Sequence, residues 1–205
     1  MSDLDTFTLL PLQIDPQTKA VSTSSSSRTL QNELATLNSL HRALLSLEAP
    51  LQVPPPPVPV NPKRSAQITK LRESANAEYR KGRHAEAVKL YSLGLQMALG
   101  RPLWEPQGLV REEVAALYAN RAQARMALLD WPEAAADAEA SVEAKRAGNA
   151  KAWWRRGKSL LEMGRHEEAR EWVKKGLELE GEEHELVALL ADVEEKLGKR
   201  RPSSS

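Results

Sequence analysis

Leucine side chains recur at intervals of three and four residues between Arg28 and Leu47. This spacing places side chains on one face of an α-helix, so it predicts an amphipathic helix with a wide apolar face. The leucines of that face are Leu30, Leu34, Leu37, Leu40, Leu44, Leu45 and Leu47. A similar apolar stripe near the C-terminal end predicts another amphipathic helix over 183–198. Its members are Leu186, Leu189, Leu190, Val193 and Leu197.

The residues before the first helix have the pattern of a β-hairpin. An apolar run over 7–14 is followed by the turn signal Asp15-Pro16 and by a second short run over 19–21, which together predict two strands. Because Pro11 cannot donate to a strand ladder, we expect the first strand at the edge of the sheet. The serine run over 22–27 is expected to form a loop and the start of the helix.

The distribution of proline divides the chain into two units. Seven of the 13 prolines fall between Pro50 and Pro62, where fixed φ angles and missing N–H donors disfavour helix and strand. We therefore expect a semi-rigid linker over 49–63. It separates an N-terminal module (1–48) from a helical domain (64–199), which is followed by a flexible tail over 200–205.

The N-terminal module is short for the leucine face that it must cover. Chains of this length seldom form a stable core without a metal, a disulfide or a partner, and the sequence contains no cysteine. The leucine face can dock on the module's own hairpin or on the helical domain. Alternatively the module binds a partner protein, with Leu30, Leu34, Leu37 and Leu44 as contact residues.

The second half of the chain contains a repeated six-residue turn. The sequences GRHAEA (82–87), LDWPEA (129–134) and GRHEEA (164–169) start 47 and 35 residues apart. A period of about 34 residues explains both offsets if extra residues are inserted near 99–111, where proline and glycine interrupt the helical pattern. Small residues recur in the same register, namely Ala75, Ala122 and Gly157 before the turns and Ala87, Ala134 and Ala169 after them.

Small side chains at fixed places allow two helices to cross closely, so each repeat is predicted to be a helical hairpin. The expected pairs are 66–81 with 84–98, 112–128 with 132–146, and 150–163 with 166–180. This pattern resembles the tetratricopeptide repeat (TPR) over 65–180. The resemblance implies a mainly α-helical fold, a three-unit helical solenoid capped by the helix over 183–198, preceded by the small hairpin-and-helix module.

Composition and motifs favour recognition over catalysis. The 29 basic and 28 acidic residues give a net charge of +1, which lacks the basic field that nucleic-acid binding draws on. The sequence has no phosphate-binding or dinucleotide loop, no nucleophile elbow and no histidine pair at metal-ligand spacing. We therefore expect no enzyme activity, no catalytic residue, no cofactor and no metal. No apolar stretch approaches the roughly 18 to 20 residues of a spanning helix, so no direct membrane span is expected.

Three cations and two amides occupy positions on the first helices of the repeats that line the concave face of such a solenoid. Arg72 and Asn76 are four residues apart and share a helix face, as do Lys151 and Arg155. Asn120 lies on the corresponding face of the middle repeat. Asparagine is an indifferent helix former, so its presence at two of these positions favours a specific role. We expect the five side chains to converge on one groove.

This set resembles the two-carboxylate clamp of chaperone-binding TPR domains, whose pattern is Lys, Asn, Asn, Lys, Arg. Asn76, Asn120, Lys151 and Arg155 match the pattern, whereas Arg72 stands where the family has lysine. That difference keeps the charge but replaces a point donor by a planar fork. The resemblance implies that the groove binds the C-terminal Glu-Glu-Val-Asp tails of cytosolic heat-shock chaperones. Cations and amides would donate to the two carboxylates of the last aspartate.

The order of the parts resembles a family of small TPR subunits of fungal post-translational protein-translocation (Sec) complexes of the endoplasmic reticulum (ER). That resemblance implies a peripheral receptor at the cytosolic face of the ER membrane that docks chaperone-bound precursors. A membrane-anchored subunit of the complex would hold it through residues 1–48. Two other interpretations stay open. One is a soluble TPR co-chaperone or adaptor that is not attached to the translocon, and the other is a scaffold whose groove holds a helix through apolar contacts.

Overall fold

A computed structural model describes residues 9–47 and 62–200. The chain divides into two compact units. The first comprises the residues before Asn61 and the short segment Pro102–Glu105, and the second contains every helix from residue 63 onward. Residues 49–61 of the predicted linker lie outside the described residues, as do residues 201–205 of the predicted tail. Lys63, which was assigned to the linker, is the first residue of a helix.

The N-terminal unit begins with the predicted hairpin. Strand β1 (Leu12–Ile14) pairs antiparallel with β2 (Val21–Thr23), so that Leu12 lies opposite Thr23 and Ile14 opposite Val21. The turn between the strands is stabilised by the Asp15 carboxylate, which accepts the backbone N–H groups of Gln17 and Thr18 at 2.9 and 2.6 Å. β1 is shorter than the apolar run over 7–14, of which residues 7 and 8 lie outside the described residues.

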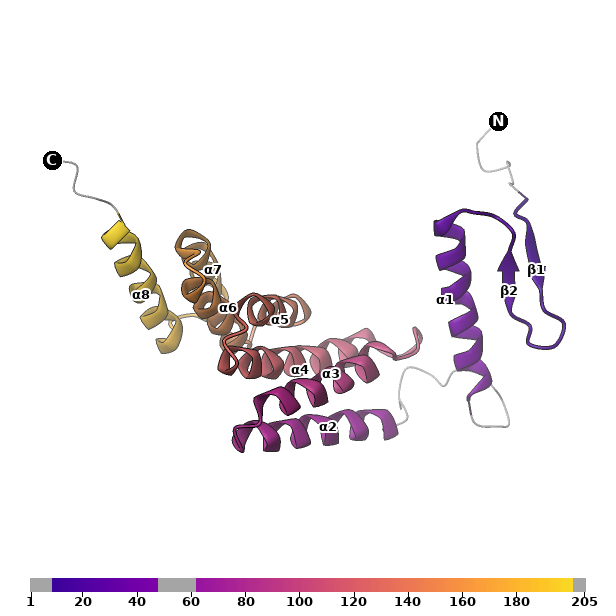
Figure 1. Cartoon of the computed structure of the whole chain (residues 1–205), viewed down its shortest axis with the longest axis horizontal. Helices are drawn as coiled ribbons and strands as arrows, with labels where there is room; N and C mark the ends of the chain where they lie inside the picture. The colour runs from indigo at the N-terminus through magenta and orange to yellow at the C-terminus, as the bar shows by residue number, and fades with distance from the viewer. Residues whose placement is uncertain (1–8, 48–61, 201–205) are drawn as a thin grey trace. The chain divides into compact units, whose positions relative to one another are not determined.

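Helix α1 (Arg28–Leu45) follows the hairpin and packs on β2. Ser27 caps its N-terminus by accepting the N–H of Leu30 at 3.4 Å. Figure 1 shows β2 between α1 and β1, and the Asn38 side chain of α1 makes two hydrogen bonds to the backbone of Val21. Leu34 is 8% exposed and is the one leucine of the helix that the fold buries. The leucine face therefore docks in part on the module's own hairpin.

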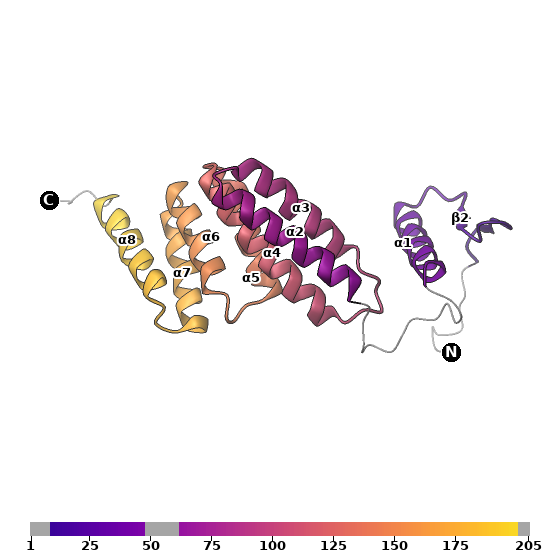
Figure 2. The ribbon, with the colours of Figure 1, turned by 90° about the horizontal axis from the view of Figure 1, so that it is seen from below.

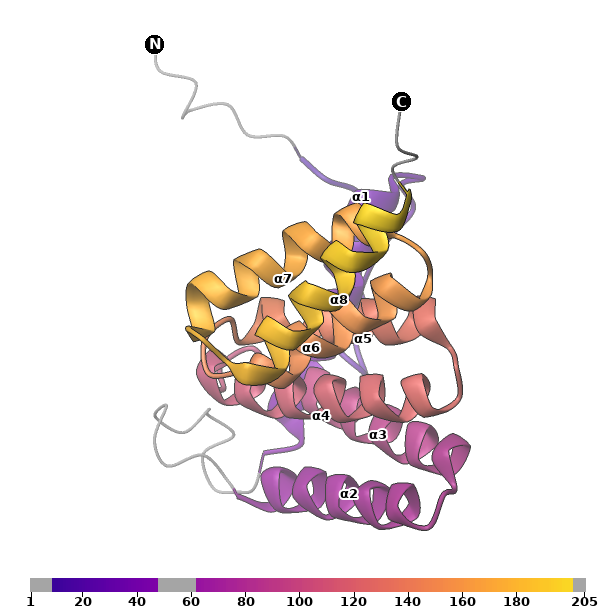
Figure 3. The same cartoon turned by 90° about the vertical axis from the view of Figure 1, so that its left-hand side faces the viewer.

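The second unit consists of three helix pairs and a final helix, as the repeats predict. The pairs are α2 (Lys63–Arg80) with α3 (His84–Leu99), α4 (Gln107–Ala127) with α5 (Trp131–Ala144), and α6 (Ala150–Glu162) with α7 (His166–Glu180). Helix α8 (His184–Arg200) covers the last pair by packing on α6 and α7 (Figure 3). The helices α2, α4, α6 and α8 pack on one another in that order, so they form one layer of the stack (Figure 2).

Small residues lie where the helices cross, as the sequence register predicts. Ala75 and Ala122 are fully buried. A Cβ atom on Gly157 would lie 2.6 Å from Val173 Cγ2 and 2.9 Å from Leu189 Cδ2. Both distances are too short for carbon atoms, so the absence of a side chain at Gly157 allows α7 and α8 to close on α6 together.

The three repeated turns share one backbone conformation. Gly82 and Gly164 have φ angles of 77° and 73°, and Leu129 at the equivalent position of the middle repeat has a φ of 63°. Glycine adopts this left-handed region without steric cost, whereas leucine does not. The middle repeat therefore keeps the turn of its neighbours with a residue that is poorly suited to it.

The insertion after α3 is shorter than predicted, because α4 begins at Gln107 and not at residue 112. Pro106 precedes the helix, a position that tolerates its missing N–H. Arg101 fixes the segment to two helices: its guanidinium donates to Ser65 Oγ at 2.7 Å and to the Glu113 carboxylate at 2.7 and 2.9 Å. The Arg101 side chain is 1% exposed, so this network is part of the interior of the solenoid.

Candidate functional site

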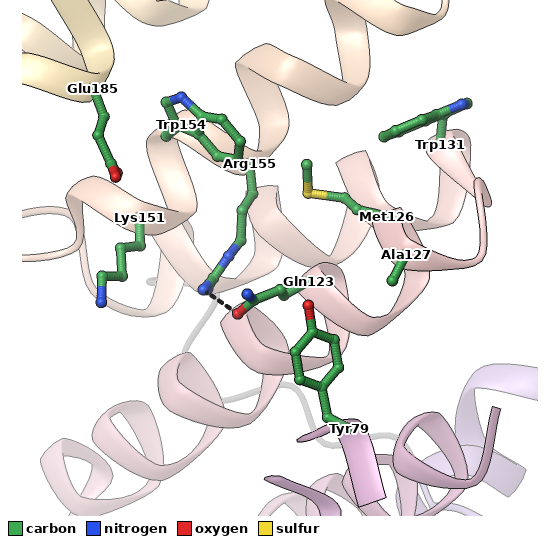
Figure 4. Close-up of a pocket in the computed structure, with 9 residues that line it drawn as sticks. All are labelled: Tyr79, Gln123, Met126, Ala127, Trp131, Lys151, Trp154, Arg155 and Glu185. Atoms are coloured by element: carbon green, nitrogen blue, oxygen red, sulfur yellow. Dashed lines mark hydrogen bonds between the residues drawn. The ribbon is translucent and has the colours of Figure 1, made fainter. Parts of the chain in front are cut away.

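Two adjoining pockets lie along the layer of α2, α4, α6 and α8. The aromatic pocket, about 550 Å³, is lined by Tyr79, Gln123, Met126, Ala127, Trp131, Lys151, Trp154, Arg155 and Glu185 (Figure 4). The polar pocket, about 640 Å³, is lined by Asn76, Ala116, Ala119, Asn120, Gln123, Gly148, Asn149, Ala150, Lys151, Arg155, Glu180, Glu183 and Glu185. Gln123, Lys151, Arg155 and Glu185 line both, so the two pockets form one continuous groove.

The polar pocket brings together most of the side chains that the sequence assigns to a carboxylate clamp. Asn76 from α2, Asn120 from α4, and Lys151 and Arg155 from α6 line it. Arg72 is not among the lining residues of either pocket. It is half-buried one helical turn before Asn76, and it makes no hydrogen bond or ion pair with the rest of the described chain.

The two asparagines contact each other across the first and second repeats. Asn120 Nδ2 donates to Asn76 Oδ1 at 3.1 Å, and the buried hydroxyl of Tyr91 donates to the same oxygen at 2.6 Å. Burial raises the pKa of Tyr91, which keeps its hydroxyl protonated as a donor. Because Asn76 Oδ1 accepts both bonds, the amide nitrogen of Asn76 remains available to donate into the pocket. Sequence reasoning did not identify Tyr91 in this role.

Arg155 forms the base of the groove. It is 7% exposed, and its guanidinium donates to the backbone carbonyl of Ala119 at 2.8 Å and to Gln123 Oε1 at 2.7 Å. Figure 4 shows it extending from α6 to Gln123 on α4. Burial lowers the pKa of Arg155, while Tyr79, Tyr91 and Glu185 act in the opposite direction. Two of the five guanidinium donors are thus used within the protein, and the desolvated charge favours an incoming anion.

Lys151 differs from Arg155 although it lies one turn away on the same helix. Its side chain is exposed and lines both pockets. Within residues 9–47 and 62–200 it makes no ion pair and no hydrogen bond. Lys151 is therefore the cation of the groove that is most available to a ligand.

Three glutamates also line the polar pocket, which sequence reasoning did not anticipate. Glu180 has a structural role, since its carboxylate accepts the N–H groups of Gly148 and Asn149 at 3.1 and 2.8 Å. Glu185, in the first turn of α8, and Glu183, directly before this helix, are exposed. The lining of the polar pocket therefore combines cations and amides with three carboxylates.

The aromatic pocket adds apolar surface that the sequence pattern did not assign to the site. Tyr79 comes from α2, Met126 from α4, Trp131 from α5 and Trp154 from α6. The adjacent Trp153 points the other way: it is buried, and its indole N–H donates to the Arg146 carbonyl at 2.9 Å.

The sequence spacing could have identified Gln123 as a residue of the site. Gln123 lies three residues after Asn120 and therefore shares its helix face.

The leucines assigned to partner binding fall into two groups. Leu37 is exposed, and Leu30 and Leu44 are half-buried. Leu34 instead belongs to the interior of the N-terminal unit. The assignment of Leu34 to partner binding, like that of the other three leucines, stays a prediction.

Residues 9–47 and 62–200 contain no group of three or more His, Asp or Glu side chains placed to hold a metal ion. A search of the same residues finds no helix that is both long enough and apolar enough to span a membrane.

Comparisons with known proteins agree with this architecture. Residues 150–182 match the tetratricopeptide repeat family. The chain is 40% identical over 164 residues to the ER protein translocation subcomplex subunit sec67 of Schizosaccharomyces pombe, an alignment that covers 78% of this chain and 85% of the relative.

Solved structures extend the similarity to the fold. A chain in the Sec complex of S. cerevisiae superposes with a TM-score of 0.76 at 23% identity, covering 93% of this chain and 100% of that chain. The second TPR domain of human RPAP3, in complex with the HSP70 peptide SGPTIEEVD, superposes with a TM-score of 0.54 at 22% identity, covering 64% of this chain and 98% of that domain. At these identities the superpositions demonstrate the shared helical solenoid.

Proposed function

The chain belongs to the family of the ER protein translocation subcomplex subunit sec67, and we propose that it acts as a peripheral receptor of the ER translocation machinery. In this role its groove binds the acidic C-terminal tails of cytosolic heat-shock chaperones, and chaperone-bound precursors are thereby delivered for post-translational translocation. The protein would act as an adaptor, without catalysis, at the cytosolic face of the membrane.

The observation that carries the proposal is the meeting of Asn76, Asn120, Lys151 and Arg155 in the polar pocket. A peptide that ends in aspartate presents its α-carboxylate and its side-chain carboxylate close together. Lys151 supplies an ammonium that has no partner among the described residues, and Asn76 supplies an amide N–H₂ whose oxygen is already occupied. Charge-assisted hydrogen bonds of this kind are shorter and stronger than neutral ones.

Arg155 also lines the polar pocket, and its positive charge contributes to the binding of a carboxylate there. Because its buried charge has only neutral hydrogen-bond acceptors, at Ala119 and Gln123, a carboxylate entering the pocket offsets part of its desolvation. The proposal does not need Arg155 to leave its partners, since three of its donors remain. Arg72 would act at longer range, because it lies outside the lining of the pocket.

The rest of the groove suits the remainder of such a tail. Tyr79, Met126 and Trp154 provide apolar surface for the side chain of the valine before the last residue. Glu183 and Glu185 also line the polar pocket and would repel a carboxylate placed directly beside them.

Attachment to the membrane would be indirect, through a membrane-anchored subunit of the translocation complex that holds the N-terminal unit. The family relationship supports this part of the proposal. The exposed leucines of the unit, Leu37 and Leu45, supply apolar surface for such a contact.

The receptor proposal is tested by removing the unpaired cation. We expect Lys151→Ala in the full chain to weaken binding of the peptide SGPTIEEVD by about tenfold to a hundredfold, the value of one hydrogen bond to a charged group. Isothermal titration calorimetry measures this directly. Lys174→Ala is the matched control, because Lys174 is an equally charged and exposed helical lysine outside both pockets. Equal binding by the two variants would show that the polar pocket does not hold the tail.

A further inference from the structure

The two edges of the N-terminal hairpin differ in how their backbone groups are satisfied. At the outer edge of β2, Asn38 Oδ1 accepts the N–H of Val21 at 2.8 Å and Asn38 Nδ2 donates to the carbonyl of Val21 at 2.7 Å. One amide side chain from α1 thus takes the place of a third strand. The backbone of β2 is therefore covered at Val21.

The outer edge of β1 has no such cover. Asp15 and Ala20 share a ladder hydrogen bond of 2.9 Å, and hydrogen-bonded and non-hydrogen-bonded pairs alternate along an antiparallel ladder. Ile14 and Val21 are the next pair, so their backbone groups point away from each other. The backbone of Val21 is hydrogen-bonded to the Asn38 side chain, whereas the N–H and C=O of Ile14 have no hydrogen-bond partner among the described residues.

The side chains along this open edge are apolar and exposed. Leu12 and Ile14, two residues apart and therefore on the same face of the sheet, are 45% and 66% exposed. No charged residue occurs between positions 9 and 14. Natural edge strands that face water are usually protected by charged side chains, bulges or a covering element. Pro11 protects the start of this strand, but nothing in the described unit protects Ile14.

We propose that the outer edge of β1 is a strand-addition site that binds an extended segment of a protein partner. The segment would pair its backbone with the free N–H and C=O of Ile14 and place alternate apolar side chains beside Leu12 and Ile14. The structure of the edge selects this occupant, because a helix has no free backbone groups to offer and an apolar ligand would leave those of Ile14 unsatisfied. This inference rests on the proposed attachment to the translocation complex and specifies how the N-terminal unit is held.

Ile14→Pro tests the site, because it deletes the N–H that points outward and leaves the hydrogen bonds between β1 and β2 in place. The probe is the detergent-solubilised translocation complex purified from cells of the same species that lack this chain. We expect Ile14→Pro in the full chain to bind this complex at least about tenfold more weakly than wild type. Ile14→Thr, which keeps the N–H and a β-branched side chain, should bind more tightly than the proline variant. Both variants should bind SGPTIEEVD normally.

A second measurement applies if the proline disturbs the hairpin. In the wild-type chain we expect amide hydrogen exchange at Ile14 to slow when the complex binds, with the Ser22 amide of the hairpin ladder as the internal reference. Unchanged exchange at Ile14 in a chain that binds the complex would overturn strand addition and leave the proposed attachment intact. Failure of the wild-type chain to bind the complex would overturn both. Edge-dependent self-association in sedimentation, abolished by Ile14→Pro, would assign the edge to a second copy and also overturn the proposal.

Discussion

Lys151 and Arg155 carry the same charge on the same helix, but their surroundings give them different tasks. Lys151 is exposed and unpaired within the described chain, so its ammonium is free for a ligand. Arg155 is buried and joins α6 to α4 through the Ala119 carbonyl and Gln123. In the proposed receptor, Lys151 therefore serves recognition alone, whereas Arg155 serves recognition and also holds two repeats together.

This difference predicts separable effects on stability. We expect Arg155→Ala to lower the free energy of unfolding by about 1–3 kcal/mol, because two acceptors lose their donor, and to weaken tail binding as well. Lys151→Ala should change the free energy of unfolding by less than about 0.5 kcal/mol. Urea unfolding of the full chain, monitored by helical circular dichroism, measures both. Equal stability of the two variants would contradict the structural role of Arg155.

The sequence allowed the side chains of the groove to be predicted by register, since Asn76, Asn120, Lys151 and Arg155 occupy equivalent faces of repeated helices. Their surroundings could not be predicted in the same way. The burial of Arg155 depends on a carbonyl of the preceding repeat, and the bond from Tyr91 to Asn76 depends on how α3 crosses α2. Such contacts arise from tertiary packing, which a pattern within one helix does not contain.

At the scale of elements, the middle repeat stands out because its turn uses Leu129 in a left-handed conformation. The equivalent positions of the other repeats hold glycine. Leucine at a positive φ costs about 1–2 kcal/mol, a cost that the packing of α4 against α5 must offset.

Replacing this leucine should relieve the strain. We expect Leu129→Gly to raise the free energy of unfolding by about 0.5–1 kcal/mol, after allowance for the greater freedom of glycine in the unfolded chain. The neighbouring variant Leu128→Gly should lower it, because Leu128 has an ordinary φ of −90° and gains nothing from glycine. Thermal unfolding of both variants checks the pair. A loss of stability in Leu129→Gly equal to that in Leu128→Gly would contradict the account of the turn.

Repeat periodicity predicted the number and order of the helices, and the TPR solenoid is confirmed. It did not predict where α4 begins, because the start depends on the insertion. Arg101 bridges Ser65 and Glu113 across a segment that has no counterpart in the other repeats, and this bridge allows the helix to start directly after Pro106. The repeat pattern therefore does not predict the structure of inserted residues, because they have no equivalent in the other repeats.

At the scale of the whole molecule, the chain combines two units with different surfaces. The solenoid carries a groove lined by amides, cations and carboxylates, while the N-terminal unit carries an open strand edge and exposed leucines. Proline content and the leucine stripe predicted this division. The closure of β2 by Asn38 was not predictable, because Asn38 lies among the polar residues of an amphipathic helix and its partner is 17 residues away in the sequence.

The proposed receptor recognises the free carboxylates at the end of a peptide. Titration of the full chain with SGPTIEEVD, and with the same peptide amidated at its C-terminus, tests this recognition. We predict that amidation weakens binding by at least about tenfold, because the α-carboxylate loses its charge-assisted bonds. Equal affinity for the two peptides would contradict the account and would leave the aromatic pocket as the binding surface.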